Sequence, residues 1–278
     1  MDYVVAICSH NRSEELKAKT LAMLHRYGIP SEKIYVFVAP EEMDQYQKVL
    51  PGVQIVQGAT GLPGNRRAVS LFFPEGAPIF CLDDDVKRFV VKSSDNRLTS
   101  ELDLNALILK GFQMSKDTGA SLWSVYPVPC ARWLKQSVTE GLVFCYGCSY
   151  GVWNRRDIVT NRAFKDDVDR SLRFYERDGK NLRLNWIAPV QSYLKGKGGL
   201  NESRTYEKEV SECMKLQMLF PTLVTIRHKK DRVDIVFPRR LCKTLPLVDA
   251  YPRSLRRRSD ASATSVAVED DSEKSEGV

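Results

Sequence analysis

Residues 80–89, FCLDDDVKRF, place three consecutive carboxylates, Asp83, Asp84 and Asp85, directly behind the apolar run 78–82. Adjacent like charges repel one another, and the end of a buried strand is a costly position for them. Hard divalent cations such as Mg2+ and Mn2+ prefer carboxylate oxygens and bridge them to phosphates. The triplet therefore predicts a metal–nucleotide site; an acidic turn that only caps the strand is the structural alternative.

Strand-like and helix-like segments alternate ahead of this triplet. Buried-strand patterns occur at 3–8, 34–39, 53–56 and 78–82, and helical spacing of apolar residues occurs at 13–26, 41–50 and 62–73. Apolar strands that alternate with helices predict an α/β fold with a mostly parallel, Rossmann-like central sheet and flanking helices. Ligands of such sheets lie beyond the carboxyl ends of the strands. The acidic triplet and the segment Ser9-His10-Asn11-Arg12 both fall at such ends.

The rest of the chain has a mixed pattern. Helices are expected at 103–116, 166–177 and 203–220, and strands at 121–126, 182–187, 223–226 and 233–237. We expect one domain over residues 1–252, divided into halves 1–90 and 91–252. Residues 253–278 are first basic, then acidic and rich in Ser and Ala, a composition typical of a disordered tail.

Charge is unevenly distributed along the chain, whose formal net charge is +7. Residues 259–278 contain six acids and one lysine, a net charge of −5, which leaves +12 on residues 1–258. A body this basic favours anionic partners such as nucleotides, nucleic acid or a membrane surface, although many basic proteins bind none of these.

Several features favour an intracellular protein without a membrane segment. No apolar stretch approaches the roughly 20 residues that a spanning helix needs, and the N-terminus runs directly into a strand pattern. Seven cysteines, without the spacing of a disulfide framework, predict reduced thiols. Cys145 and Cys148 form a C-x-x-C pair, but without a second pair nearby we interpret them as core residues, not zinc ligands.

The segment GLPGNRRA at residues 61–68 has glycines ahead of an expected helix and a pair of arginines. Amides at a helix N-terminus together with arginines can hold the phosphates or the base of a nucleotide. An ordinary loop with a solvated arginine pair is the alternative. The position just upstream of the acidic strand favours a binding role.

Taken in order, these segments resemble the GT-A class of metal-dependent glycosyltransferases, which use nucleotide sugars, over about residues 3–230. The match rests on Ser-His-Asn-Arg, Gly-x-x-x-Asn-Arg-Arg and Leu-Asp-Asp-Asp, followed by a loosely matching glycine loop at 146–151. The resemblance implies a GT-A fold with a donor-binding half and a mixed acceptor-binding half. Implied donor-binding residues are Ser9, Asn11, Arg12, Gly64, Asn65, Arg66, Asp83 and Asp84. Implied ligands of Mn2+ or Mg2+ are Asp85, Asp83 and the C-terminal His228.

Three segments are similar to a narrower family, the glycosyltransferases associated with TET/JBP hydroxylases, which include base J glucosyltransferases and phage relatives. These segments are GLPGNRRA, LDDDV and, at residues 164–174, FKDDVDRSLRF. The similarity implies transfer of a sugar, glucose from UDP-glucose, to a hydroxymethyluracil or hydroxymethylcytosine in DNA. The expected partners are therefore a nucleotide sugar and hydroxymethylated DNA, and the expected location is intracellular.

A second acidic cluster opens the helix expected at 166–177. An acceptor hydroxyl needs a base within reach as it attacks the sugar. The GT-A pattern x-Glu-Asp matches Lys165-Asp166-Asp167 with Asp in place of Glu, so the resemblance assigns the base to Asp167, with Asp166 beside it. Asp169 is the rival on another side of the helix, and simple capping is the alternative for each. With such a base, a single displacement inverts the anomeric configuration.

Other functions remain open at this point. A glycosyltransferase acting on a protein or a small molecule would share every donor-site residue. A sugar-nucleotide pyrophosphorylase is disfavoured, because Ser-His-Asn-Arg stands where those enzymes have a Gly-x-Gly-x-x-Arg-like loop. An inactive nucleotide- or DNA-binding module is disfavoured because both acidic clusters are present. Arg155 and Arg156 are candidate contacts to acceptor phosphates, and the run 253–258 is a further basic segment.

Overall fold

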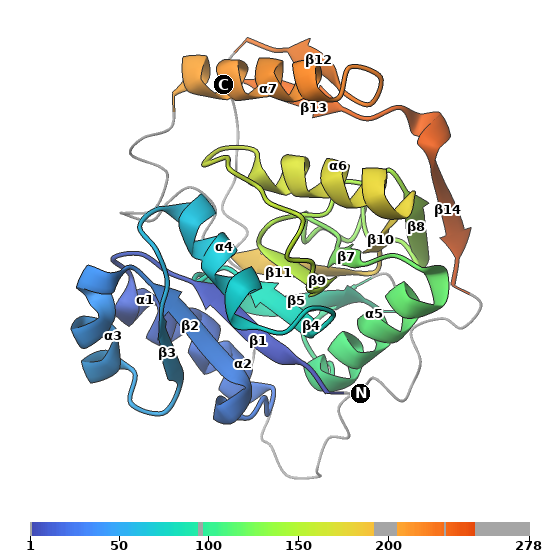
Figure 1. The fold of residues 1–278 in the computed structure, drawn as a ribbon. Coiled ribbons are helices and arrows are strands. Elements are labelled where there is room, and N and C mark those ends of the chain that lie inside the picture. The colour runs from blue at the N-terminus through green and yellow to red at the C-terminus, as the bar shows by residue number, and fades with distance from the viewer. Residues whose placement is uncertain (1, 94–96, 192–204, 231, 248–278) are drawn as a thin grey trace.

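The computed structural model describes residues 2–93, 97–191, 205–230 and 232–247 and contains a nine-stranded central sheet (Figure 1). The strands in spatial order are β14 (Cys242–Pro246), β8 (Ser137–Gly141), β10 (Asn181–Leu184), β7 (Leu122–Val125), β9 (Ser149–Trp153), β4 (Pro78–Leu82), β1 (Val4–Cys8), β2 (Ile34–Val38) and β3 (Gln54–Gln57). β3, β2, β1 and β4 pair in parallel, as do β7 and β10. Only β8 and β9 run against the other strands of this sheet, so the expected mostly parallel sheet is confirmed.

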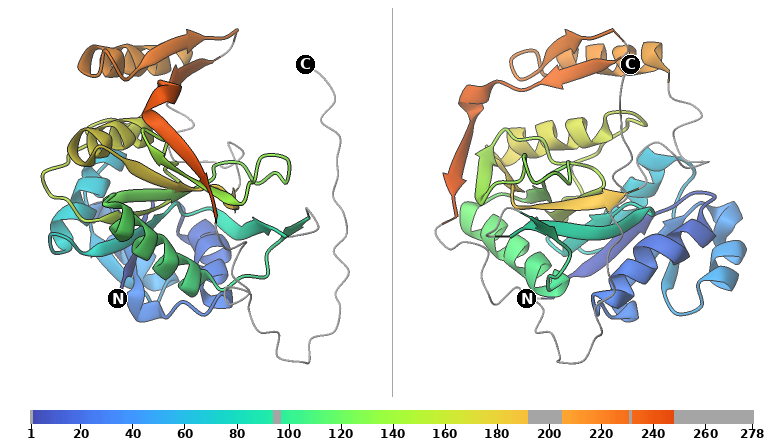
Figure 2. Two further views of the ribbon diagram at one scale, coloured as in Figure 1. Left: turned by 90° about the vertical axis from the view of Figure 1, so that its right-hand side faces the viewer. Right: turned by 180° about the vertical axis from the view of Figure 1, so that it is seen from behind.

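Helices cover both faces of the sheet (Figures 1 and 2). The helices are α1 (Ser13–Leu16), α2 (Ala22–Arg26), α3 (Met43–Val49), α4 (Leu62–Phe72), α5 (Leu104–Thr118), α6 (Asp166–Asp178) and α7 (Tyr206–Leu219). Side chains alternate along β1 and β4, because successive residues of a strand point to opposite faces. Ala6, Ile79 and Cys81 pack with Val69 of α4 and Phe174 of α6 on one face. α4 and α6 therefore share that face.

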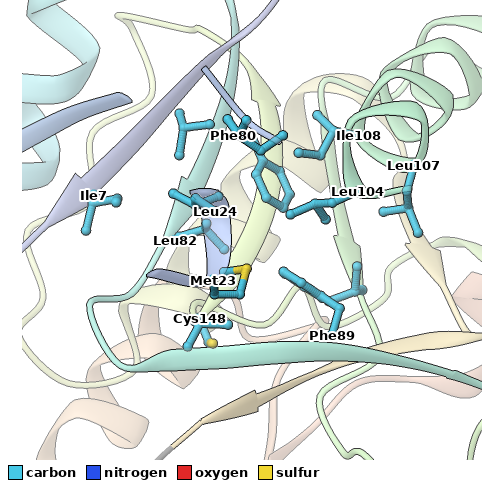
Figure 3. Packing of buried hydrophobic residues seen from close by; sticks show 14 of the residues in the cluster. Ile7, Met23, Leu24, Phe80, Leu82, Phe89, Leu104, Leu107, Ile108 and Cys148 are labelled. Carbon is cyan, nitrogen blue, oxygen red and sulfur yellow. The ribbon is translucent and has the colours of Figure 1, made fainter. Parts of the chain in front are cut away.

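The other face carries the larger core. Ile7, Phe80 and Leu82 of the sheet pack there against Met23 and Leu24 of α2 and against Leu104, Leu107 and Ile108 of α5 (Figure 3). Transfer of such apolar side chains out of water contributes roughly 25 cal/mol per Å2 of buried surface. Because both faces of the central strands are buried, these strands read as continuous apolar runs in the sequence.

Two smaller sheets flank the main one. β5 (Val86–Lys92) pairs with β11 (Ile187–Gln191) and with β6 (Leu98–Thr99). β12 (Thr225–His228) and β13 (Val233–Val236) form an antiparallel hairpin that lies with α7 at one end of the molecule, next to α6 (Figures 1 and 2).

Some elements differ from the sequence expectation. The single strand expected at 182–187 is two strands, β10 and β11, which belong to different sheets and are separated by Asn185 and Trp186. The buried Asn185 side chain donates to the hydroxyls of Ser137 and Thr139 at 3.0 and 2.9 Å, and so fixes the turn. The helix expected at 13–26 is α1 and α2 joined by a π-helical stretch, Lys17–Leu21. The tail expected at 253–278 lies outside the described residues.

The sheet brings the two predicted ligand segments together. Ile7 of β1 is in register with Leu82 of β4, so Ser9 and Asp83 follow neighbouring strand ends. The carboxyl ends of parallel strands form the edge at which open α/β sheets bind ligands. This edge is where the candidate site lies.

Candidate functional site

The acidic triplet forms the tight turn between β4 and β5. The Asp83 amide donates to the carbonyl of Cys148 at 3.0 Å, which ties the turn to the loop before β9. The hydroxyl of buried Thr20 donates to the Asp83 carbonyl and accepts from the Val86 amide, both at 2.9 Å. Backbone hydrogen bonds therefore fix the turn and leave the three carboxylates to other partners.

The carboxylate of Asp84 is bound by side chains of the loop after β1. Its buried carboxylate accepts from the Ser9 hydroxyl at 2.7 Å and from Arg12 Nη1 at 3.2 Å. Burial raises the pKa of Asp84, and the Ser9 hydrogen bond and the Arg12 charge oppose that rise. Asp84 thus joins two of the predicted donor-binding residues to the triplet, and acts within the protein as an anchor for their loop.

The carboxylates of Asp83 and Asp85 have fewer close partners among the described residues than the carboxylate of Asp84. The Asp83 side chain is 42% exposed, and its carboxylate lies 3.7 Å from Arg66 Nη2. Burial raises the pKa of Asp83; Arg66 opposes the rise, and Asp85 and Asp84 add to it. Burial and then Asp84 likewise raise the pKa of Asp85. The turn therefore crowds negative charge at a point that solvent reaches.

The loop after β1 is built by side chains that sequence reasoning missed. Asn11 has a left-handed backbone with φ 55°, and its amide donates to Glu42 Oε1 at 2.6 Å. The hydroxyl of Tyr46 hydrogen-bonds the Ser9 hydroxyl at 2.7 Å and accepts from the Arg12 amide at 3.0 Å. Glu42 and Tyr46 lie in or next to α3, and only the folded chain brings them to this loop.

Asn65 lies inside the protein at the start of α4. Its side-chain amide donates to the carbonyl of Phe37 at 2.8 Å, which ties α4 to the end of β2. A Cβ atom at Gly58 would lie 1.8 Å from Asn65 Oδ1, so the chain needs glycine there. A Cβ at neighbouring Gly64 is 3.0 Å from the Cβ of Ala59, a tight helix–loop contact. Both predicted residues thus support the start of α4, the helix that carries Arg66.

The second acidic cluster lies at the start of α6, after Lys165, whose backbone is left-handed with φ 60°. Asp166 is held by two guanidinium groups, Arg66 Nε at 2.9 Å and Arg170 Nη1 at 3.1 Å. Asp169 is fully buried between Arg173 Nε at 2.9 Å and Arg162 Nε at 3.6 Å.

Asp167 differs from its two neighbours. Within the described part of the chain it forms no ion pair, and its Oδ1 accepts only from the amide of Val168 at 2.9 Å. A Cβ built on Gly147 would lie 3.2 Å from the Asp167 Cβ, so this half-buried side chain faces the glycine loop. Burial and then the neighbouring Asp166 charge raise the pKa of Asp167. It is the carboxylate of this cluster with the fewest protein partners.

Arg66 connects the two acidic clusters. Its guanidinium lies 2.9 Å from Asp166 and 3.7 Å from Asp83, and Nη1 donates to the Tyr150 hydroxyl at 2.7 Å. Arg170 stacks on the same tyrosine, with Cζ 3.9 Å from the ring centroid. A cavity of about 70 Å3 on this face of the sheet is lined in part by Arg66, Tyr150 and Arg170. Tyr150 and Arg170 lie within the matched segments 146–151 and 164–174, but neither was predicted as a site residue.

His228 stands apart from these residues in the hairpin β12–β13. It is exposed and hydrogen-bonds the Tyr206 hydroxyl at 3.2 Å. Within the described ranges, no group of three or more His, Cys, Asp or Glu side chains is arranged to hold a metal ion. His228, Asp83 and Asp85 therefore do not form one metal-binding cluster in this structure.

None of the helices in the described residues has the length and hydropathy that a membrane span requires.

No protein-family model and no curated protein matches the sequence. Among solved structures, a mannosyltransferase from Pyrobaculum calidifontis with GDP-Man and Mn2+ has a TM-score of 0.46 and 11% identity, covering 79% of this chain and 63% of its own. S. aureus TarS with UDP has a TM-score of 0.46 and 13% identity, covering 78% and 66%. A 4-diphosphocytidyl-2C-methyl-D-erythritol synthase from Anaerococcus prevotii has a TM-score of 0.38 and 14% identity, covering 78% and 99%. This chain thus spans less than two thirds of the first two, and likenesses with TM-scores below 0.5 carry no argument about its activity.

Proposed function

We propose that this chain is a metal-dependent glycosyltransferase that moves a sugar, glucose from UDP-glucose, to the hydroxyl of a 5-hydroxymethyl-pyrimidine in DNA. The observation that carries the proposal is the pair of acidic clusters at the binding edge of the sheet, joined by Arg66. One cluster suits a cation and a diphosphate, and the other offers a carboxylate to an acceptor hydroxyl.

The donor set of the acidic triplet fits a hard divalent cation. Asp83 and Asp85 carry carboxylates whose pKa values are raised by burial and by neighbouring acids, and a cation beside them would relieve that repulsion. These two residues would hold Mn2+ or Mg2+, with Asp84 fixing the turn from within. When bound, the cation supplies neutralising charge for the diphosphate leaving group.

The loop after β1 and the start of α4 flank this turn and suit a nucleotide. Asp84 and Tyr46 fix Ser9 and Arg12 beside it. Arg66 presents a buried positive charge between the donor side and the acceptor side. Fixed donors and cations of this kind bind phosphate and ribose oxygens without reorganising, which supports transition-state charge at little cost.

Asp167 is the proposed general base. Asp166 and Asp169 are engaged by two arginines each, whose guanidinium groups compete with an acceptor hydroxyl for their carboxylate oxygens. Asp167 forms no ion pair within the described residues, and burial and the Asp166 charge raise its pKa against the opposing charges of Arg170 and Arg66. Removal of the acceptor proton by Asp167 as the hydroxyl attacks the anomeric carbon gives a single displacement and inversion.

The DNA acceptor is supported by the net charge of +12 on residues 1–258 and by the resemblance of the three motifs to DNA-modifying glycosyltransferases. A protein or small-molecule acceptor would leave the donor side unchanged. Identification of the glycosylated product distinguishes the DNA acceptor from these alternatives.

The test is mass spectrometry of hydroxymethylated DNA after incubation with the protein, Mn2+ and a panel of nucleotide sugars, with unmodified DNA and Asp167→Asn as controls. The proposal expects one added hexose on the modified base, with glucose from UDP-glucose, none on unmodified DNA, and a strongly reduced yield with Asp167→Asn. Consumption of the donor without a change in the DNA would show that the acceptor hydroxyl belongs to another molecule. Absence of donor turnover with any acceptor would refute the enzymatic activity.

A further inference from the structure

The described C-terminal strands carry a concentration of positive charge that the donor site does not use. Residues 225–243 contain seven lysines and arginines and two aspartates. The cations are Arg227, Lys229, Lys230, Arg232, Arg239, Arg240 and Lys243, and all seven are exposed. We call these seven side chains the basic surface.

Ion pairs neutralise only a small part of the basic surface. Asp234 lies 2.8 Å from Lys229 Nζ and 3.4 Å from Arg232 Nε. Arg227 faces the same aspartate across the hairpin, as its register partner. Arg227, Lys230, Arg239, Arg240 and Lys243 have no ion-pair partner within the described part of the chain.

The register of the hairpin turns this charge outward. Ile226 and Ile235 are cross-strand partners, and both pack in the apolar cluster formed with α6 and α7. Side chains alternate along a strand, so the next pair, Arg227 and Asp234, points to the opposite face. Core packing therefore holds the cations toward solvent.

The basic surface adjoins the acceptor side of the candidate active site. Lys165, the residue before Asp166, donates through Nζ to the carbonyl of Val233 in β13 at 3.4 Å and to Glu209 of α7 at 3.2 Å. Arg162 Nη1 donates to Glu212 of α7 at 2.6 Å. The unit made by α7 and the hairpin is thus fastened to the segment that opens α6, where the proposed base lies.

The shape of the basic surface favours a linear polyanion. The charged residues run from the hairpin through the 3-10 turn Arg239–Leu241 into β14, the strand at one edge of the main sheet (Figures 1 and 2). Exposed cations in succession along the chain suit a nucleic-acid backbone, whose phosphates repeat along its length. Tyr206, 40% exposed and bonded to His228, adds an aromatic ring beside these cations.

We propose that the basic surface docks the phosphate backbone of the acceptor DNA and so presents the modified base to Asp167. This inference rests on the proposed function, because it assigns the acceptor side of the same site. The contacts are to phosphate, so binding is expected to be independent of sequence and of base modification, and strongly dependent on salt.

The test measures binding of a fluorescent, unmodified DNA duplex to the full chain by anisotropy over a range of NaCl concentrations. The variant is Arg227→Gln, Lys230→Gln and Arg240→Gln, three cations whose removal leaves no described acid without a partner. The matched control is Lys48→Gln, Lys110→Gln and Lys116→Gln, which removes the same charge from exposed positions on α3 and α5. Circular dichroism and calorimetric binding of UDP with Mn2+ check that fold and donor site are retained.

We expect the basic-surface variant to lose more than about tenfold in affinity and to lower the salt slope by about 0.9 for each phosphate contact removed. The control should bind nearly as wild type does. Equal losses in the two variants would overturn the inference, since net charge alone would then explain them, and so would wild-type DNA binding by the variant. Tighter binding to anionic phospholipid vesicles than to DNA would overturn the choice of partner. DNA binding that follows the prediction without sugar transfer in the product assay would instead count against the proposed function alone.

Discussion

Changing Asp166 and Asp167 to asparagine one at a time should separate an effect on stability from an effect on catalysis. Asp167→Asn keeps the side-chain shape, and its amide oxygen can still accept from the Val168 amide, as Asp167 Oδ1 does at 2.9 Å. No described cation loses a partner, so the melting temperature should stay close to that of the wild type. The variant cannot take the acceptor proton, and general-base catalysis contributes about 100- to 10,000-fold.

Asp166→Asn should have the opposite effect. Arg66 and Arg170 lie 2.9 and 3.1 Å from Asp166, and its side chain is 13% exposed. Removing one partner of a buried ion pair costs about 3 to 5 kcal/mol, because the other charge is left uncompensated. In a domain of this size each kcal/mol lowers the melting temperature by about 2 to 4 °C, so we expect a fall of roughly 6 to 20 °C.

The assay combines thermal unfolding, calorimetric binding of UDP with Mn2+, and single-turnover sugar transfer. We expect Asp167→Asn to bind the donor normally and to transfer about 100- to 10,000-fold more slowly. Near wild-type transfer by this variant would refute the assignment of the base. A stable Asp166→Asn protein that binds donor but does not turn over would show that the roles of the two carboxylates are reversed.

Three further outcomes follow from the same geometry. Asp85→Asn should abolish metal-dependent binding of the nucleotide sugar without unfolding the chain, and EDTA should abolish the same binding in the wild type. Calorimetry with and without Mn2+ checks this, and unchanged metal dependence in the variant would rule out Asp85 as the main ligand. Because the base acts in its ionised form and burial raises the pKa of Asp167, kcat/KM should fall on acidification at a pH above the ordinary aspartate range; a flat profile down to that range would contradict the assignment. Gly147→Ala should slow transfer by up to about tenfold, because the added Cβ would lie 3.2 Å from the Asp167 Cβ and 3.4 Å from Arg170 Nη2, and small displacements of a catalytic group lower the rate. Undiminished turnover would show that Asp167 does not need this space.

The alternation of apolar strands and helices in the first 82 residues was enough to predict the parallel part of the sheet. The inner strands β1, β2 and β4 are largely buried on both faces, so their sequences are apolar throughout, and the neighbouring helices show a clear period. The same reasoning predicted one strand at 182–187, where the chain forms two. That turn depends on hydrogen bonds from Asn185 to Ser137 and Thr139, which are more than 40 residues away in sequence. The direction of the reversed strands β8 and β9 also depends on their neighbours, because strand direction leaves no mark in a segment of five residues.

Both acidic clusters could be found from the sequence, because consecutive carboxylates at a strand end and at a helix start are local patterns. The different roles of the carboxylates within the second cluster could not be predicted from the sequence. Asp166, Asp167 and Asp169 have the same chemistry in the sequence. Only the folded chain brings Arg66 to Asp166 across 100 residues and leaves Asp167 without an ion pair among the described residues. The basic charge of residues 225–243 was likewise present in the composition, but its position beside α6 depends on packing of Ile226 and Ile235. Local sequence determines which groups are available, whereas the contacts that tune a carboxylate are set by tertiary structure, because electrostatic interactions act over a few ångströms of space and not along the chain.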